Sequence, residues 1–338
     1  MVRNQSFLSQ SLPNTTNTDN SSRKFVLSFP SQVFQAEFSP YEWSQNLLCI
    51  ALKDKIVVGT LSFQEEDENT QESVEFSTIH EFCHVSRIHA IAWSPDASVS
   101  ALPSLLSFYT ADSEFNVCHF DNTKNGSQFF KSLGKHSDYV NSVACDPERN
   151  YLASVSDDHT CRLWPLKDDG TEVILFYLSS PGMSVSWHRQ EPSKLLVAEK
   201  AGLIHMYNIE TQRAILSVDS AQVPLMAADW SPSNCSRIGC VAGSDLIIRD
   251  VTAPSSPVET RPIHMDGGQI LRFSPTSENH VATIGRSDHQ LKVSHVGSSQ
   301  PILTAMLQVY GGLSWHYRLP LLCASSDRKL MIFKVLTK

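Results

Sequence analysis

The chain has 338 residues, 41% of them hydrophobic, so it is long enough to bury a large core in one or two domains. Its 35 acidic residues outnumber the 27 basic ones, and the formal net charge of −8 argues against non-specific nucleic-acid binding, which needs clustered Lys and Arg. The eight cysteines show no CxxC spacing, so we expect buried free thiols in a reducing compartment and neither a disulfide framework nor a zinc site.

The first 23 residues are rich in Ser, Asn, Thr and Gln and contain few apolar side chains. Such a composition cannot bury enough apolar surface to offset the entropy of folding, so we predict a disordered polar tail over residues 1–23. The tail lacks the continuous apolar core of a secretory signal. No apolar run in the chain approaches the length that crosses a bilayer, so we expect no membrane insertion.

Residues 24–338 contain a short motif that recurs seven times: an apolar residue, a spacer and a bulky residue, followed in most copies by a turn. The copies are Ala36-x-Phe38, Ile91-x-Trp93, Val143-x-Cys145, Val185-x-Trp187, Ala228-x-Trp230, Leu271-x-Phe273 and Leu313-x-Trp315. The last four of the six intervals between bulky positions are 42 or 43 residues. Repeats of about 40–45 residues are typical of four-stranded propeller blades. We therefore predict an all-β, seven-bladed WD40 β-propeller over residues 24–338.

A short apolar stretch, Phe25 to Phe29, precedes the first complete blade, and the seventh repeat ends one strand short after its apolar segment at 330–333. An N-terminal strand that pairs with the last blade would supply the missing strand and cover an open sheet edge. We predict that Phe25–Phe29 closes the ring in this way.

Residues 134–164 form the most complete repeat. His136, Ser154, Asp158 and Trp164 are spaced so that imidazole, hydroxyl, carboxylate and indole can form one buried hydrogen-bond network across the blade. The first three residue types also occur in catalytic triads. Trp164 completes the structural set and leaves Ser154 buried, so we favour a structural role. No other repeat keeps the whole set, and we expect the others to rely on packing.

Residues 80–84, His-Glu-Phe-Cys-His, match the HExxH pattern of zinc proteases, which requires a helix. The flanking residues alternate with period two, and on a strand the two histidines would lie about 13 Å apart, too far for one metal. We therefore predict a strand. The acidic run at 65–75 is interpreted as a solvated loop, with docking of a basic partner as the alternative.

Other catalytic signals are weak. Residues 182–186, Gly-Met-Ser-Val-Ser, lack the final glycine of a nucleophile elbow, and no glycine-rich phosphate loop opens a helix. We therefore expect no enzyme activity, no cofactor, no metal and no small-molecule ligand. A propeller without reactive groups presents loops from seven blades, which suits protein–protein contact.

The chain resembles the small WD-repeat nucleoporins of the Y-shaped outer-ring complex of the nuclear pore, in their animal form. The segments that carry the resemblance include SFQEEDE at 62–68, IAWSPD at 91–96, SPGMSVSWH at 180–188, QVPLMAADW at 222–230, RPIHMD at 261–266 and SWHYRLPL at 314–321. The resemblance implies a scaffold that docks on the largest stem nucleoporin and, through it, joins the other outer-ring nucleoporins. It also implies roles in pore assembly and in RNA and protein transport, and an association with kinetochores in mitosis.

The docking surface is a separate hypothesis. Apolar side chains near predicted loops are favoured at interfaces, so we expect contacts from two segments. The candidate residues are Val223, Leu225, Met226, His264 and Met265. The alternative function is that of a WD-repeat adaptor or substrate receptor of another complex, such as a ubiquitin ligase. Receptors of that kind often carry a Trp-Asp pair at a strand end, and this chain has none.

Overall fold

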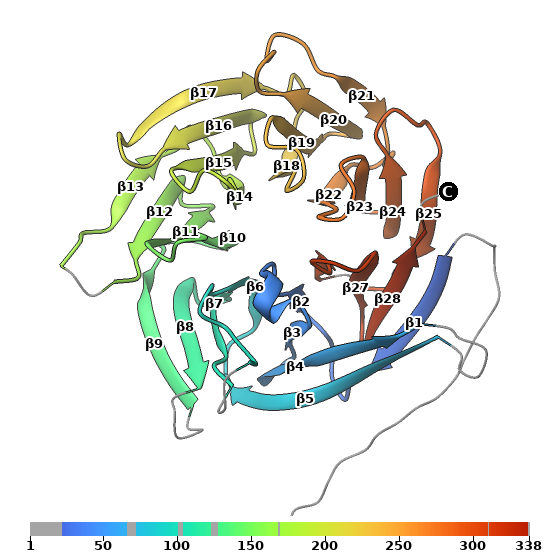
Figure 1. Ribbon diagram of the computed structural model, residues 1–338. Coiled ribbons are helices and arrows are strands. Elements are labelled where there is room, and N and C mark those ends of the chain that lie inside the picture. The colour runs from blue at the N-terminus through green and yellow to red at the C-terminus, as the bar shows by residue number, and fades with distance from the viewer. Residues whose placement is uncertain are drawn as a thin grey trace, which may run out of the picture.

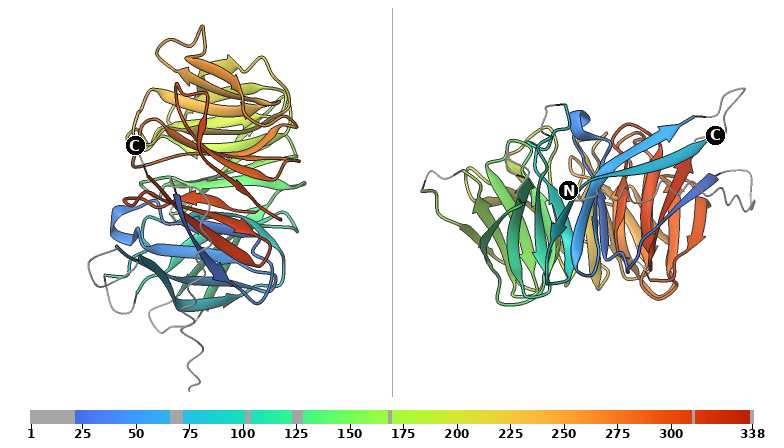
Figure 2. Two further views of the ribbon diagram at one scale, coloured as in Figure 1. Left: turned by 90° about the vertical axis from the view of Figure 1, so that its right-hand side faces the viewer. Right: turned by 90° about the horizontal axis from the view of Figure 1, so that it is seen from below.

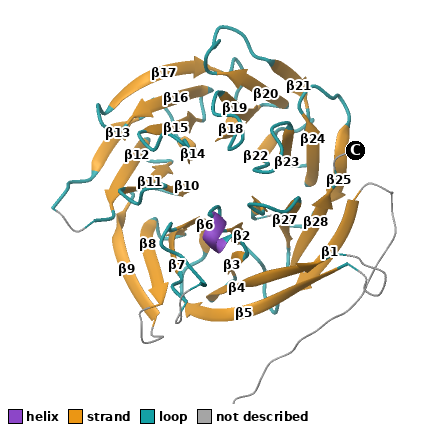
Figure 3. Ribbon diagram, viewed as in Figure 1, coloured by secondary structure: helices purple, strands orange, loops and turns teal. Residues whose placement is uncertain are grey.

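The computed structural model describes residues 22–65, 72–100, 104–122, 128–167, 170–309 and 311–336. Seven four-stranded antiparallel sheets stand radially around a central axis (Figure 1). Seen from the side they form a disc, with the strands running across its thickness (Figure 2). Within the described ranges the single helical element is a short 3-10 turn, η1 (Glu42–Ser44), near the centre of the ring (Figure 3). The predicted seven-bladed propeller is confirmed.

Each blade contains four strands, which are named from the innermost to the outermost. The blades are β2 (Gln35–Phe38), β3 (Leu47–Ala51), β4 (Lys55–Gln64), β5 (Ser73–Cys83); β6 (Ile88–Trp93), β7 (Ser107–Asp112), β8 (Asn116–Asn122), β9 (Gln128–Lys135); β10 (Val140–Cys145), β11 (Tyr151–Ser156), β12 (Thr160–Pro165), β13 (Ile174–Tyr177); β14 (Gly182–Trp187), β15 (Lys194–Glu199), β16 (Leu203–Asn208), β17 (Arg213–Asp219); β18 (Leu225–Trp230), β19 (Arg237–Ala242), β20 (Asp245–Asp250), β21 (Glu259–Pro262); β22 (Gly268–Phe273), β23 (His280–Gly285), β24 (Gln290–His295), β25 (Pro301–Met306); and β26 (Leu313–Trp315), β27 (Leu321–Ser326), β28 (Lys329–Val335), β1 (Ser22–Ser28).

The ring is closed by β1, which pairs antiparallel with β28 from Ser22 opposite Val335 to Ser28 opposite Lys329. The predicted closing strand is therefore confirmed, but it begins at Ser22 and not at Phe25. Ser22 and Arg23 accordingly belong to the propeller and not to the predicted tail. The remainder of that tail, residues 1–21, lies outside the described residues.

The seven copies of the sequence motif all lie at the ends of the innermost strands. Because side chains alternate along a strand, the apolar and bulky residues pack between blades while the spacer faces the central channel. In three blades the bulky residue also donates a hydrogen bond to the preceding blade. Trp93 Nε1 bonds the carbonyl of Glu37 at 2.9 Å, and Trp187 and Trp315 reach the spacer carbonyls of their preceding blades at 2.9 and 3.1 Å. These indoles therefore tie neighbouring blades together.

Three local predictions have mixed outcomes. His80 lies inside strand β5, which confirms the strand and rules out the helix that a HExxH site needs. The acidic run does not form one solvated loop: residues 66–71 lie outside the described part, Glu75 belongs to β5, and the largely buried Glu72 carboxylate lies 2.5 Å from Lys334 Nζ. All eight cysteines are outside disulfides, but Cys83 and Cys235 are exposed, against the expectation of buried thiols.

Candidate functional site

The His-Ser-Asp-Trp set of blade three is brought together in the interior. His136 Nδ1 lies 2.8 Å from Asp158 Oδ2, His136 Nε2 lies 2.7 Å from Ser154 Oγ, and Trp164 Nε1 donates to the same Oγ at 2.8 Å. Burial lowers the pKa of His136. Although burial alone would raise it, hydrogen bonds from Thr160 and His136 lower the pKa of Asp158 to about 2. Ser154 Oγ is fully buried between two partners, where no substrate can reach it.

Blade six contains a second version of this network that the sequence reading missed. His264 Nδ1 lies 2.9 Å from Asp288 Oδ2, and His264 Nε2 lies 3.0 Å from Thr283 Oγ1. Lys292 Nζ donates to the carbonyl of Ile263 at 2.5 Å, as Arg162 of blade three donates to the carbonyl of Lys135 at 3.0 Å. The prediction that the other blades rely on packing is therefore wrong for blade six. A search that allowed Thr in place of Ser would have found it.

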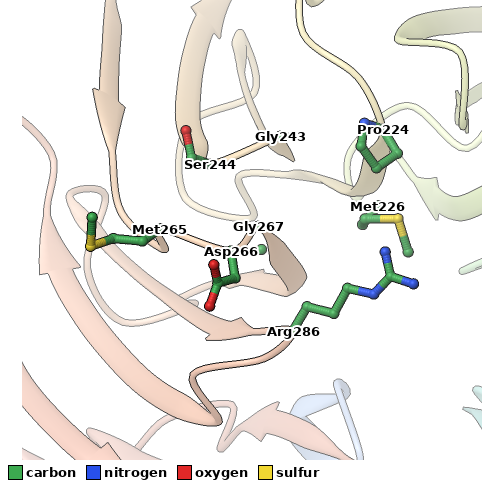
Figure 4. A pocket seen from close by; sticks show the side chains of 9 residues that line it. Pro224, Met226, Gly243, Ser244, Met265, Asp266, Gly267 and Arg286 are labelled. Carbon is green, nitrogen blue, oxygen red and sulfur yellow. The ribbon is translucent and has the colours of Figure 1, made fainter.

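An open pocket of about 350 Å³ lies between blades five and six, at the mouth of the central channel (Figure 4). The loops that connect successive blades lie at this end of the ring. The pocket is lined by Pro224, Met226, Gly243, Ser244, Met265, Asp266, Gly267, Gly268 and Arg286. In Figure 4 the Arg286 guanidinium points toward the Met226 thioether. The pocket combines flexible apolar side chains with two opposite charges, a composition suited to a protein partner.

The five residues proposed for docking differ in their exposure to solvent. Met265 is 95% exposed, Val223 is also exposed, and Met226 lines the pocket. Leu225 and His264 are fully buried, so neither can contribute to a surface. Leu225 packs in the core shared by blades four and five, and His264 belongs to the blade-six network. Their assignment to the docking surface was wrong, because residues next to each other on a strand or turn face opposite ways.

A repeated backbone feature positions the side chains around the channel mouth. In blades two to six the innermost strand has a β-bulge at the same step, which inserts one residue and redirects its side chain. The inserted residues are His89, Asn141, Met183, Met226 and Gln269. His89 Nε2 lies 2.6 Å from the carbonyl of Val140, and Asn141 Nδ2 donates to the carbonyl of Gly182 at 2.9 Å. Methionine has no such donor.

The channel wall carries charges that the sequence reading passed over, because they occupy the spacer positions of the motif. Ser314 Oγ donates to Glu37 Oε1 at 3.2 Å, and Ser186 Oγ donates to Asp229 Oδ1 at 3.0 Å. Burial raises the pKa of Glu37 to about 7 and raises that of Asp229, while Arg272 acts in the opposite direction on both. These groups bridge neighbouring blades. Listing the spacer residues of all seven copies would have revealed them.

The described residues offer neither of two further kinds of site. No cluster of three or more His, Cys, Asp or Glu side chains among them is arranged to hold a metal ion. No helix in this part of the chain is both long and apolar enough to cross a bilayer.

A closed ring of seven sheets, with one hydrogen-bonded His-Ser-Asp-Trp blade and an adaptable pocket at its mouth, defines a WD-repeat propeller with the surface of a protein-binding scaffold. The family model "WD domain, G-beta repeat" matches residues 127–165, which include β9 of blade two and the three inner strands of blade three, β10 to β12.

Three relatives extend this match over most of the chain. Nucleoporin Nup37 of Mus musculus is 42% identical over 89% of this chain and 93% of the relative, and the Homo sapiens protein is 41% identical over the same shares. Nucleoporin Nup37 of Drosophila melanogaster is 43% identical over 74% of this chain and 78% of the relative. The chain therefore belongs to the nucleoporin Nup37 family. It is a scaffold nucleoporin of the nuclear pore complex at the nuclear envelope.

Proposed function

We propose that this nucleoporin is a non-catalytic component of the Y-shaped outer-ring complex, and that it docks on the largest stem nucleoporin through the channel mouth between blades five and six. The docking surface consists of Val223, Met226 and Met265. The observation that carries the proposal is Met265, which is 95% exposed at the edge of the pocket that Met226 lines. An unbranched thioether adapts to the shape of an apolar partner, and exposing one in water gains nothing for the isolated fold.

The proposed cellular roles follow from membership of that complex. Through the stem nucleoporin the chain would join the other outer-ring nucleoporins, support pore assembly and contribute to RNA and protein transport. Kinetochore association in mitosis is part of the same proposal. A non-catalytic role is supported by the burial of Ser154 and by its two hydrogen-bond partners, His136 and Trp164.

The test is quantitative capture of the tagged chain from interphase cells, followed by mass spectrometry. Met265→Asp places a charge in an apolar contact, so recovery of the stem nucleoporin should fall by about tenfold or more, as for other central interface residues. Because Met265 is exposed, the variant should keep the thermal unfolding curve of the parent chain.

Val85→Asp is the matched control. Val85 is 96% exposed and occupies the corresponding loop position of blade two, one residue after the histidine of that loop, but it lines no part of the pocket. Recovery should be unchanged in this variant. Equal recovery from the Met265 variant would exclude the surface, and capture of a ubiquitin-ligase adaptor in place of outer-ring nucleoporins would contradict the proposed function.

A further inference from the structure

The outer rim of blade three has an unusual edge. Its outermost strand, β13, lies within six consecutive apolar residues, Val-Ile-Leu-Phe-Tyr-Leu at 173–178. On one side β13 pairs with β12, and among the described residues no strand pairs with its other side (Figure 1). An uncharged apolar strand with an open edge can pair with another chain.

The outermost strands of the other blades carry the features that discourage such pairing, namely charged side chains or a proline. The features are Lys24 in β1, Glu75 and Glu81 in β5, Lys131 and Lys135 in β9, Arg213 and Asp219 in β17, Glu259 and Arg261 in β21, and Pro301 at the start of β25. Strand β13 has neither a charge nor a proline. It is therefore the outermost strand best suited to accept an added strand.

The geometry of β13 presents backbone and side chains together. Leu178 donates its N–H to the carbonyl of His159 at 2.8 Å, on the side of β12. Because backbone groups alternate along a strand, those of Leu175 and Tyr177 point to the open edge. The side chains of Val173, Leu175 and Tyr177 lie on one face of the strand and are exposed, Tyr177 at 80%. An extended segment could thus find hydrogen-bonding groups and an apolar row at the same place.

The facing strand of blade two adds positive charge. Leu175 lies opposite Arg162, whose guanidinium donates to the carbonyl of Lys135 in β9, so this face of β13 is the one directed toward β9. On β9, Lys131 shares a face with Leu133, which packs against the core that contains Trp164 of blade three. Lys131 and Lys135 are exposed, in a chain whose net charge is −8.

We propose that this rim surface, made by Phe129, Lys131, Val173, Leu175 and Tyr177, binds an extended segment of a partner protein as a fifth strand of blade three. The segment has alternating apolar residues, which pack on Val173, Leu175 and Tyr177, and acidic residues, which meet the lysines of β9. Main-chain hydrogen bonds supply affinity and the side chains supply selectivity, as in other cases of strand addition.

The rim surface is separate from the channel mouth of blades five and six, so the inference does not depend on the docking proposed above. A propeller with one binding surface at its mouth and another on its rim connects two partners. That arrangement suits a scaffold.

The probe is a fluorescent peptide, Glu-Glu-Val-Thr-Val-Thr-Val-Glu-Glu, titrated with the full chain and followed by anisotropy. The comparison peptide has Lys at every Glu position. Charge complementarity predicts that the acidic peptide binds about tenfold more tightly than the basic one. Leu175→Pro removes a backbone N–H that β12 does not use, so it should weaken binding about tenfold while the thermal unfolding curve is retained.

Thr304→Pro is the matched control, because Thr304 of β25 is the third residue before Leu307, which donates to His289 as Leu178 donates to His159. This variant should bind the acidic peptide like the parent chain. Equal binding of the two peptides, unchanged binding by the Leu175 variant, or no binding of the acidic peptide overturns the proposal. Light scattering measures the oligomeric state of the parent chain and of the Leu175→Pro variant. A parent dimer that becomes a monomer in the variant would show that a second copy of the chain, and not a partner protein, occupies the edge.

Hydrogen exchange gives a second measurement on the assembled protein. In the captured outer-ring complex the amides of Leu175 and Tyr177 should exchange more slowly than in the isolated chain, whereas the amide of Thr304 should not change. Equal exchange of Leu175 in both states contradicts a covered edge. The channel-mouth variant Met265→Asp should leave peptide binding unchanged, so the two proposals fail independently.

Discussion

The channel mouth is built differently on its two sides, although the backbone is the same. At blades two and three the residue inserted by the bulge is His89 or Asn141, and each bonds a carbonyl of the next blade. At blades four and five the same step inserts Met183 or Met226, and Met226 lines the pocket. The same β-bulge therefore places side chains that link neighbouring blades on one side of the mouth and apolar side chains on the other.

The comparison also shows that exposure alone does not define a binding site. Val85 and Met265 follow the loop histidines of blades two and six and are 96% and 95% exposed. Met265 borders the pocket between blades five and six, and Val85 does not. Met226 and Arg286, which line the same pocket, are neighbours of Met265 that a partner can contact together with it.

The largest expected effect is on thermal stability and comes from removing β1, the strand that closes the ring on which both sides of the mouth are built. Deleting residues 22–28 removes β1 and leaves β28 with an open edge. The melting temperature should fall by about 10 °C or more, because roughly 2–4 °C corresponds to each kcal/mol in a chain of moderate size. Calorimetry measures this, with deletion of residues 1–21 as the control. Equal melting of the two deletions would mean that the ring does not depend on β1.

A smaller effect should separate the two sides of the mouth. Asn141→Leu removes the donor to Gly182 and to Asp157 Oδ1, which lies 2.8 Å from Asn141 Nδ2. Leaving these acceptors unpaired should lower the free energy of unfolding by about 2 kcal/mol. Met226→Leu conserves volume and should cost less than about 1 kcal/mol while weakening partner recovery. Urea titrations of both variants test the contrast, and equal losses of stability would remove it.

The smallest effect concerns the channel wall. Burial raises the pKa of Glu37 to about 7, above its value in the unfolded chain, so the folded state retains this proton over a pH range in which the unfolded state loses it. The resulting stability is present below the unfolded pKa and is lost as pH rises through about 7. Glu37→Gln should therefore unfold at a higher urea concentration than the parent chain at pH 8, with a smaller difference at pH 5. An unchanged pH profile would contradict this.

The sequence was sufficient for the fold because each innermost strand needs an apolar residue and a bulky one to pack between blades, and that requirement repeats at nearly constant spacing. The closing strand followed from counting strands. The first residue of that strand could not be predicted, since residues 22–23 are polar and contribute backbone pairing that composition does not reveal.

The candidate site was harder to predict because exposure depends on contacts between blades. Leu225 and Met226 are adjacent, yet the first is buried and the second lines the pocket. The bulges that redirect these side chains leave no distinct signal in one sequence. His264 was misplaced because its partners, Thr283 in β23 and Asp288 in the turn before β24, are distant in the sequence, and Thr283 differs in type from its blade-three counterpart, Ser154.

The pairing of Ser22 with Val335 has a consequence for how the protein is made. Strand β1 is synthesised long before its partner β28, so the ring cannot close until β28 has left the ribosome. Until then the nascent polypeptide offers unpaired edges to chaperones. A polypeptide that lacks β28 leaves β1 without its pairing partner, so the ring can close only in copies that contain both strands.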